Sequence, residues 1–384
     1  MQIYIHIPFC VKKCAYCDFL SGPHNQEVIE KYVKSLCQEI EMYNVYNTLS
    51  PNEQVEDVTT VFVGGGTPSI LTPDQIKRIF ETLRGSFQIS KSAEITIEAN
   101  PGTVTKEKLL AYRECGINRI SFGLQSANDA ELKVLGRIHT YDMFVESFKM
   151  ARECGFANIN VDLMSAIPNQ TMQSFEETLN KVIQLQPEHI SAYSLIVEEG
   201  TPFARLYGEG CPKEQELPTE EEEREIYYKS EQILAQAGYR RYEISNYAKP
   251  GMECKHNVGY WERKEYIGFG LGAAGLINET RLRNTDNLEY YIANASNPER
   301  LKKKTEILTK TAQMEEYMFL GMRKTEGVSI SRFAALFGKA MEYYYGKQIQ
   351  KLQKDGLIQV KGDYMMLTKR GIDVSNYVLS EFIQ

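Results

Sequence analysis

Three cysteines near the start of the chain combine residue types and spacing that could do chemistry. Cys10, Cys14 and Cys17 stand in one short stretch, "CVKKCAYC". Three thiolates can bind zinc with a histidine such as His6 or His24 as the fourth ligand, or hold three irons of a [4Fe–4S] cluster. Zinc ligands usually come as two separated pairs, whereas these three stand together. The spacing therefore favours a cluster whose fourth iron is open to a small amino-carboxylate ligand.

Strand and helix patterns alternate through the first half of the chain and must position this cysteine stretch. Segments with helical periodicity separate six β-rich runs, at 3–7, 60–63, 94–99, 119–124, 158–164 and 189–195. Such alternation forces parallel pairing through right-handed crossovers. Six units predict an α/β protein with a partial (β/α)6 barrel and not a complete eightfold one.

The loops after these strands contain the other candidates for chemistry, because the active site of a parallel α/β barrel lies at the C-terminal ends of its strands. The first strand leads into the cysteines. The later strands end in "GGGTPS" (64–69), "EANPGT" (98–103), "GLQS" (123–126), "VDLM" (161–164) and "AYSL" (192–195). We therefore expect one face to present three thiols, several glycines, Glu98, Gln125 and Asp162.

Charge and hydropathy exclude several classes of protein. The 384 residues carry a net charge of −7, so no overall positive field attracts nucleic acid or an anionic membrane. No apolar run approaches the roughly 20 residues of a membrane span, and the first residues do not resemble a signal peptide. We expect a cytoplasmic protein, in which the eight cysteines do not form a disulfide framework.

The strand–helix rhythm ends near residue 205, which predicts three regions. They are a partial barrel over 1–205, a linker helix with an α+β region over 206–300, and a winged-helix-like region over 301–384. Thr219 and Glu222 form a capping-box pattern that starts the linker helix, which runs to about Ala237. The lysines on a helix of the last region are interpreted as a solvated face, so this region is expected to be a lid or docking unit that binds no nucleic acid.

Several motifs together resemble the radical S-adenosylmethionine (SAM) superfamily. C-x3-C-x2-C after a first strand, followed by "GGGTPS" after the second, is similar to that superfamily. "YIHIPFC", "EANPGT", "RISFGLQS" and "LGRIHT" resemble its branch containing oxygen-independent coproporphyrinogen III oxidase and the HemW haem chaperones, over nearly the whole chain. The resemblance implies a radical-SAM barrel, with a [4Fe–4S] cluster on Cys10, Cys14 and Cys17 and SAM on the fourth iron.

The resemblance also implies which residues bind SAM, and their types suit the task. Glycines allow a close backbone approach, and the planar fork of an arginine can bind a carboxylate through two oxygens. Carboxylates and an amide can bond the amino group and the ribose hydroxyls, while tyrosines flank the cluster. The implied residues are Tyr4, Tyr16, Gly65, Gly66, Thr67, Glu98, Gln125, Arg137 and Asp162.

Local features distinguish the chaperones from the oxidases. The oxidase pattern has a further cysteine two residues beyond the third, where this chain has Phe19. It also has an extension ahead of the cluster strand, whereas this sequence begins with the strand. In the expected loop at 254–261, "HNVGYW" matches the HNxxYW motif that is associated with haem in the chaperones. These features favour the chaperones.

The resemblance implies that haem contacts His256, Asn257, Tyr260 and Trp261. A histidine can ligate haem iron, and the two aromatic rings offer flat faces to a porphyrin. By residue type alone, His256 more often bonds its neighbours and Trp261 anchors the second region, so the haem role rests on the resemblance. Cys254 is an alternative thiolate ligand. The sequence lacks the C-x-x-C-H signature of covalent c-type attachment.

The implied function is a haem chaperone that binds haem b and passes it to an acceptor haem protein such as a respiratory enzyme. Any membrane contact would be peripheral, through that acceptor, and a homodimer stays open, as do SAM cleavage and the electron donor. The alternative is a radical SAM coproporphyrinogen III oxidase that performs oxidative decarboxylation. A zinc-stabilised nucleic-acid-binding protein is a second alternative.

Overall fold

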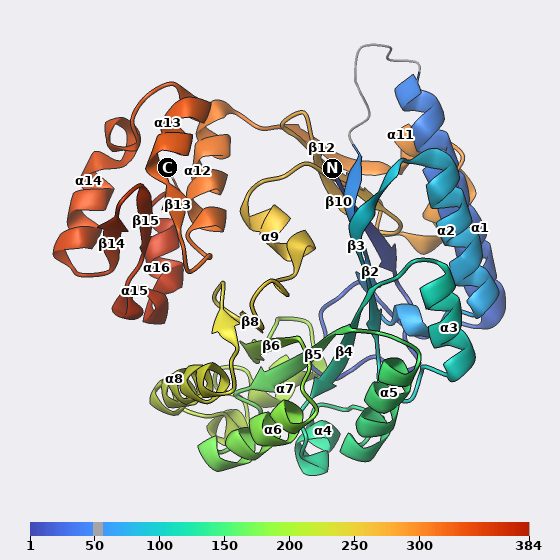
Figure 1. The fold of residues 1–384 in the computed structure, drawn as a ribbon, viewed down its shortest axis with the longest axis horizontal. Coiled ribbons are helices and arrows are strands. Elements are labelled where there is room, and N and C mark those ends of the chain that lie inside the picture. Colours follow the sequence, from blue (N-terminus) through green and yellow to red (C-terminus); the bar gives the residue numbers. More distant parts are fainter. Residues whose placement is uncertain (49–56, 384) are drawn as a thin grey trace.

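A twelve-stranded sheet runs through the structure, a computed structural model that describes residues 1–48 and 57–383 (Figure 1). Its strand order is β12-β11-β10-β9-β1-β2-β3-β4-β5-β6-β8-β7. The six central strands pair in parallel and in chain order. They are β1 (Gln2–Ile7), β2 (Val58–Gly65), β3 (Ile89–Ala99), β4 (Arg119–Gln125), β5 (Asn158–Ser165) and β6 (His189–Ser194). This arrangement confirms the predicted partial (β/α)6 barrel.

Helices connect these strands and lie along the outer side of the sheet (Figure 1). They are α1 (Gln26–Thr48), α2 (Pro73–Ser86), α3 (Lys106–Glu114), α4 (Asp129–Val134), α5 (Tyr141–Glu153) and α6 (Met172–Gln184). Threonines begin several of them, as Thr72 does for α2 by accepting a hydrogen bond from the Gln75 N–H. No helix in the described residues is both long and apolar enough to cross a membrane.

The alternation of side chains along β1 and β4 decides what faces the interior of the barrel. In β1, Ile3, Ile5 and Ile7 are fully buried in the core, while Tyr4 points the other way, into a cavity. In β4, "RISFGLQ", the apolar residues likewise join the core beneath the helices. Arg119 and every second residue after it therefore lie on the inner face.

Later segments extend the same sheet at both edges. β9 (Tyr266–Phe269) pairs in parallel with β1, and three antiparallel strands follow, β10 (Ala274–Ile277), β11 (Thr280–Asn284) and β12 (Lys302–Ile307). At the other edge β8 (Asn246–Ala248) pairs antiparallel with β6 and with β7 (Arg240–Arg241). The predicted linker helix is α8 (Glu220–Gln236), which begins with the expected Thr219 capping box. Residues 206–300 thus help to build the main sheet, and the boundaries at 205 and 300 stay predictions.

The remaining short elements flank these strands. They are α7 (Pro202–Tyr207), α9 (Lys255–Trp261), α10 (Leu288–Asn294), α11 (Pro298–Leu301) and the 3-10 turns η1 (Pro68–Ile70) and η2 (Glu214–Glu216). Figure 1 shows α9 between the main sheet and the C-terminal elements.

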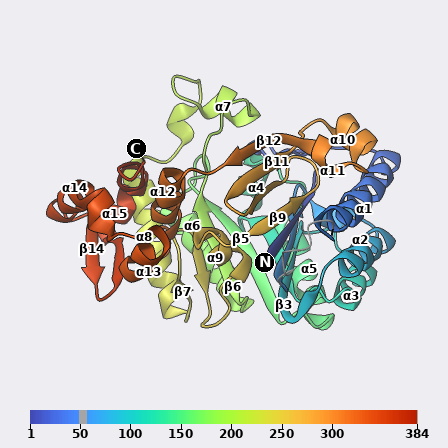
Figure 2. The ribbon, with the colours of Figure 1, turned by 90° about the horizontal axis from the view of Figure 1, so that it is seen from above.

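The last part of the chain forms a unit with its own core and a three-stranded sheet of order β13-β15-β14. Its elements are α12 (Lys310–Gly321), β13 (Val328–Ser329), α13 (Ile330–Phe337), α14 (Met341–Lys354), β14 (Ile358–Lys361), β15 (Tyr364–Leu367), α15 (Lys369–Asp373) and α16 (Ser375–Ser380). Helices beside a small antiparallel sheet confirm the predicted winged-helix-like arrangement. The unit lies across the molecule from α1 and α2 (Figure 1 and Figure 2).

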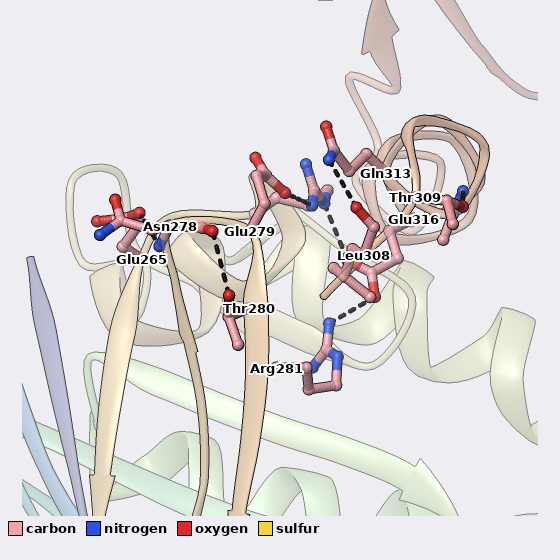
Figure 3. Close-up of polar contacts among 11 residues, drawn as sticks. Glu265, Asn278, Glu279, Thr280, Arg281, Leu308, Thr309, Gln313 and Glu316 are labelled. Carbon is pink, nitrogen blue, oxygen red and sulfur yellow. Dashed lines mark hydrogen bonds and ion pairs between the residues drawn. The ribbon is translucent and has the colours of Figure 1, made fainter. Parts of the chain in front are cut away.

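Ion pairs join this C-terminal unit to the edge of the main sheet. Figure 3 shows Arg281 of β11 donating to Glu316 of α12 over 2.5 Å. Arg263 also donates to Glu316, over 3.0 Å, and pairs with Glu279 at the turn before β11. Because Glu316 accepts from two arginines at once, α12 is held in one position against the sheet.

Candidate functional site

A cavity of about 530 Å³ extends from the cysteine loop into the barrel. It has an outer end, at the three cysteines, and an inner end, at Arg119 and α9. Every residue predicted for the cluster and for SAM lines it, namely Tyr4, Cys10, Cys14, Tyr16, Cys17, Gly65, Gly66, Thr67, Glu98, Gln125, Arg137 and Asp162. Of the residues predicted for haem, His256, Asn257 and Tyr260 line it, whereas Trp261 does not.

Backbone hydrogen bonds hold the cysteine loop over the strand ends. The Cys10 N–H donates to the Gly22 carbonyl over 3.0 Å, and the Ala15 N–H donates to the Leu135 carbonyl over 3.2 Å. All three thiols are half-buried and free. The Cys10 sulfur accepts from the Thr67 hydroxyl at 3.5 Å. These bonds hold the three thiols together above the ends of the strands.

The glycines after β2 allow the backbone to close against this loop. A Cβ on Gly66 would lie 2.6 Å from the Phe9 carbonyl oxygen and 3.0 Å from the Cys10 sulfur. Gly65 has φ +112°, and a Cβ there would meet the His6 ring at 2.6 Å. These positions fit glycine for a steric reason.

The donor set suits an iron–sulfur cluster better than one zinc ion. Both ring nitrogens of His6 are engaged, one 2.9 Å from the Tyr4 hydroxyl and the other 3.0 Å from the Leu20 carbonyl oxygen. Among the described residues, no three His, Cys, Asp or Glu side chains form a group that could hold one ion. Three thiols on one loop, without a nitrogen ligand, are the donors that a [4Fe–4S] cluster uses.

Two carboxyl groups face the cavity beyond the cysteine loop. Burial, with a contribution from nearby Asp162, raises the pKa of Glu98 to about 8, although one of its oxygens accepts from the Gly65 N–H at 3.0 Å. Burial also raises the pKa of Asp162, which accepts from Ser121 at 3.0 Å and from Asn160 at 2.7 Å. A cationic ligand placed between Glu98 and Asp162 would be stabilised by both.

Arg137 reaches the same end of the cavity and is already largely engaged. Its guanidinium donates to the Asn100 side chain over 2.8 Å, to the Gly123 carbonyl over 2.6 Å and to the Cys14 sulfur over 3.4 Å. Only Nε is buried without a partner. Arg137 therefore positions the cysteine loop, with Nε left to donate to a ligand. Gln125, at φ +73°, accepts from the Tyr193 hydroxyl at 3.2 Å.

The expectation that residues 254–261 form a loop is wrong, because residues 255–261 form α9. The Glu94 carboxylate of β3 accepts from the first two N–H groups of this helix, those of Lys255 and His256, at 3.1 Å each. An anion at a helix N-terminus satisfies N–H groups that have no partner within the helix. The cap comes from a distant strand, so the local sequence does not reveal it.

His256 is buried at the inner end of the cavity, with 1% of its surface exposed. Its Nδ1 lies 2.8 Å from the Thr60 hydroxyl and its Nε2 lies 2.9 Å from the Tyr260 hydroxyl. Burial, with the charge of Arg119, lowers its pKa to about 3. The imidazole is therefore neutral at physiological pH, as a metal ligand must be, but both of its nitrogens are occupied.

The other two haem candidates lie elsewhere. Trp261 packs against Arg323, whose guanidinium carbon is 4.5 Å from the ring centre, and so contacts the C-terminal unit between α12 and β13. Cys254 is fully buried outside the cavity lining and donates to Glu94 at 3.6 Å. Burial raises the pKa of its thiol to about 12. Cys254 is thus protonated, and the alternative of a thiolate ligand there is not supported.

Among the lining residues that sequence reasoning missed are Asn100, Tyr193 and Arg119. Asn100 lies between Thr67 and Arg137, donating to the first and accepting from the second. For Arg119 a signal was available: in "RISFGLQ" every second residue is apolar, which places the arginine on the face opposite the core.

Comparison with known proteins agrees with this geometry. Residues 4–182 match the radical SAM superfamily model, and residues 308–374 match the HemN C-terminal domain. The Heme chaperone HemW of Bacillus subtilis (strain 168) is 39% identical, covering 99% of this chain and 98% of the relative. The Heme chaperone HemW of Lactococcus lactis subsp. lactis (strain IL1403) is 35% identical, covering 99% of this chain and 96% of the relative.

A solved structure shares the whole fold. Coproporphyrinogen III oxidase (HemN) from Escherichia coli, described as a radical SAM enzyme, matches with a TM-score of 0.85 at 24% identity. The match covers 100% of this chain and 90% of that one. Radical SAM proteins carry a [4Fe–4S] cluster and bind SAM, and the outer end of the cavity offers suitable donors. By its full-length identity to those relatives, the chain belongs to the HemW family of the radical SAM superfamily.

Proposed function

We propose that this protein is a haem chaperone, which binds haem b and passes it to an acceptor haem protein while carrying a [4Fe–4S] cluster and SAM. The observation that carries the proposal is that one cavity joins the cysteine loop to α9, so the residues proposed for the cluster and three of the four proposed for haem, His256, Asn257 and Tyr260, line the same space. The same barrel would thus hold both the cluster and haem.

At the outer end, Cys10, Cys14 and Cys17 would hold three irons, and SAM would complete the fourth. When bound, the cluster and SAM would supply electron-transfer chemistry at this end. The chain's own residues would hold the ligand in place: Glu98 and Asp162 present acceptors to its amino and hydroxyl groups. Tyr16 and the glycine backbone would exclude water.

At the inner end, His256 is the residue proposed to ligate haem iron. Its neutral imidazole suits that role, but the Tyr260 hydroxyl occupies Nε2 at 2.9 Å. Haem binding would therefore require the Tyr260 side chain to turn away and free that nitrogen. We propose Tyr260 as the partner that haem displaces, with Asn257 beside it in the same helix and cavity.

The mouth of the cavity carries exposed apolar side chains, which supports transfer to another protein. Phe19 and Ile196 line the cavity with 60% and 68% of their surfaces exposed, and Val11 on the cysteine loop is 59% exposed. Large apolar side chains at a cavity mouth are typical of sites that contact a hydrophobic ligand or a partner. An acceptor protein would contact this rim, at the outer end of the cavity.

The test is anaerobic titration of the iron-reconstituted, full-length protein with haem. We expect stoichiometric binding by the wild type, a changed haem spectrum for His256→Ala, and tighter binding for Tyr260→Phe because Nε2 is released. His24→Ala is the matched control, since His24 is exposed and lies outside the cavity lining. A spectrum that survives unchanged in His256→Ala would reject this ligand. Turnover of coproporphyrinogen III without haem binding would favour the oxidase.

A further inference from the structure

Arg119, at the start of β4, is a buried cation without a partner of its own. Only 2% of its surface is exposed, and it lines the inner end of the cavity. Its Nε has no hydrogen-bond partner, and no described carboxylate forms an ion pair with it. Burying an unpaired charge costs free energy. A native protein that keeps such a group therefore has another use for it.

The nearest carboxylate is committed to a different element. Glu94 accepts from the Cys254 thiol and from the N–H groups of Lys255 and His256, so its oxygens point toward α9. Asp162 accepts from serine and asparagine side chains further along the inner face. The negative charges of Glu94 and Asp162 favour the charged form of Arg119 and raise its pKa, but neither carboxylate forms an ion pair with it.

Other unpartnered polar atoms gather around the same place. Thr96 of β3 is the register partner of Arg119, and its hydroxyl is buried without a hydrogen bond. Asn246 of β8 lines the cavity, and its side-chain oxygen also has no partner. Orphaned atoms on the paired strands β3 and β4, with another at Asn246 on the cavity wall level with Asp162, indicate that the cavity is built to be completed by a polar group from outside the chain.

Arg119 stands at the end of β4 away from the cysteine loop, two residues before Ser121, the register partner of Glu98. Six residues separate it from Gln125 at the other end of the strand, which is roughly 20 Å at 3.3 Å per residue. The Arg119 charge acts to lower the pKa of His256, and it acts against the burial that raises the pKa values of Glu98 and Asp162. A ligand at the inner end would therefore meet Arg119 and His256 together, with Phe62 stacked on the histidine ring at 5.2 Å.

We propose that Arg119 is a carboxylate-binding residue for the inner ligand of the cavity and that it pairs with a propionate of haem. The identity of this carboxylate rests on the haem function proposed above. A guanidinium fork matches the two oxygens of a carboxylate, and such a pair gains strength where water is excluded. The flat apolar wall beside it, Phe62 and His256, suits a porphyrin edge.

Haem dimethyl ester separates this proposal from general porphyrin binding, because its propionates are capped and neutral while its ring and iron are unchanged. We expect the wild-type, cluster-loaded protein to bind haem about tenfold to hundredfold more tightly than the diester in anaerobic titration. Arg119→Gln should lose that preference by binding haem more weakly and the diester equally well. Arg119→Lys, which keeps the charge without the fork, should lie between them.

Arg300→Gln is the matched control, because Arg300 is exposed and outside the cavity lining. It should keep the wild-type preference for haem. The melting temperature of ligand-free Arg119→Gln is measured beside it, because Glu94 and Asp162 favour the charged guanidinium and its loss is expected to lower stability whatever Arg119 binds. A purely structural arginine would give a fall in melting temperature with the preference for haem intact.

Two outcomes overturn the assignment. If haem binds but the wild type does not distinguish it from the diester, or Arg119→Gln still does, then Arg119 does not hold a propionate and the haem function stands. If neither ligand binds wild type or variant, the haem function itself fails, and the propionate assignment fails with it.

Discussion

The outer and inner ends of the cavity differ in charge and in how the chain builds them. At the outer end, Glu98 and Asp162 face the cavity with raised pKa values, so that end would be stabilised by a cation. At the inner end, Arg119 is a cation without a partner. The outer end comes from loops that follow consecutive strands, whereas the inner end combines β3 and β4 with α9 from much later in the chain. A cavity with two acidic groups toward one end and an arginine toward the other offers positions for two different ligands.

The prediction with the largest expected effect concerns loss of the [4Fe–4S] cluster from the outer end. Cys14→Ser should lower bound iron from about four per chain to near zero, because a cluster on three thiolates does not survive the loss of one. Haem affinity should change by about twofold at most if the inner end is independent. Iron analysis and haem titration measure the two effects. Cys211→Ser, at a cysteine outside the cavity lining, should change neither. If Cys14→Ser loses haem binding as well as iron, haem binding at the inner end depends on the cluster at the outer end.

A second test uses the raised pKa of Glu98. The folded carboxyl, with a pKa of about 8, binds more protons than the unfolded one between about pH 4.5 and 8, so its ionisation lowers stability as pH rises through that window. Glu98→Gln should therefore match the wild type near pH 5 and exceed it by up to about 4 kcal/mol at pH 8. Unfolding of the ligand-free protein at several pH values measures this difference.

The stabilities of the wild type and Glu98→Gln should also be compared with SAM present. SAM carries a sulfonium cation, which should stabilise the wild type more than Glu98→Gln at pH 8 and so narrow the gap between them. A gap that is constant from pH 5 to pH 8 would mean that Glu98 does not titrate in this range. If SAM leaves the stability difference between wild type and Glu98→Gln unchanged, its sulfonium does not lie beside Glu98.

A third and smaller effect concerns the cap of α9. Glu94→Ala leaves the Lys255 and His256 N–H groups and the Cys254 thiol without their acceptor, which should cost about 2–3 kcal/mol of stability. Urea unfolding gives this value, and haem affinity should fall with it while iron content is kept. Glu265→Ala is the control.

That control removes a comparable acceptor, because Glu265 accepts from the Asn278 N–H at an exposed turn (Figure 3). Water can replace it there, so the expected cost is below about 1 kcal/mol. Equal losses in Glu94→Ala and Glu265→Ala would contradict a special role for Glu94 at the inner end.

Much of the fold could be predicted because its signals are local. Alternating apolar residues marked all six central strands, and the Thr219 capping box marked the start of α8. Convergence of the strand ends followed from parallel pairing, which is why the residues predicted for the outer end line one cavity.

The inner end could not be predicted in the same way, because distant residues decide it. Glu94 caps α9 across 161 to 162 positions, so a stretch that resembles a loop becomes helical. Trp261 belongs to the same motif as His256, yet the helix directs it toward Arg323. The alternation of residues along β4 places Arg119 on the inner face, but its lack of a partner is visible only in three dimensions.

The seating of α9 has a consequence for the order in which the protein is made. Gln2 of β1 donates to the carbonyls of Lys255 and His256, and a Cβ on Gly259 would lie 2.2 Å from the Gln2 side chain. β1 is therefore synthesised more than 250 residues ahead of the segment that covers its inner face. Until α9 has been synthesised, the inner end of the six-stranded barrel is open, and Gln2, Glu94 and Arg119 are exposed to water. A nascent chain stalled before residue 255 would carry its cysteine loop on a barrel that cannot yet close.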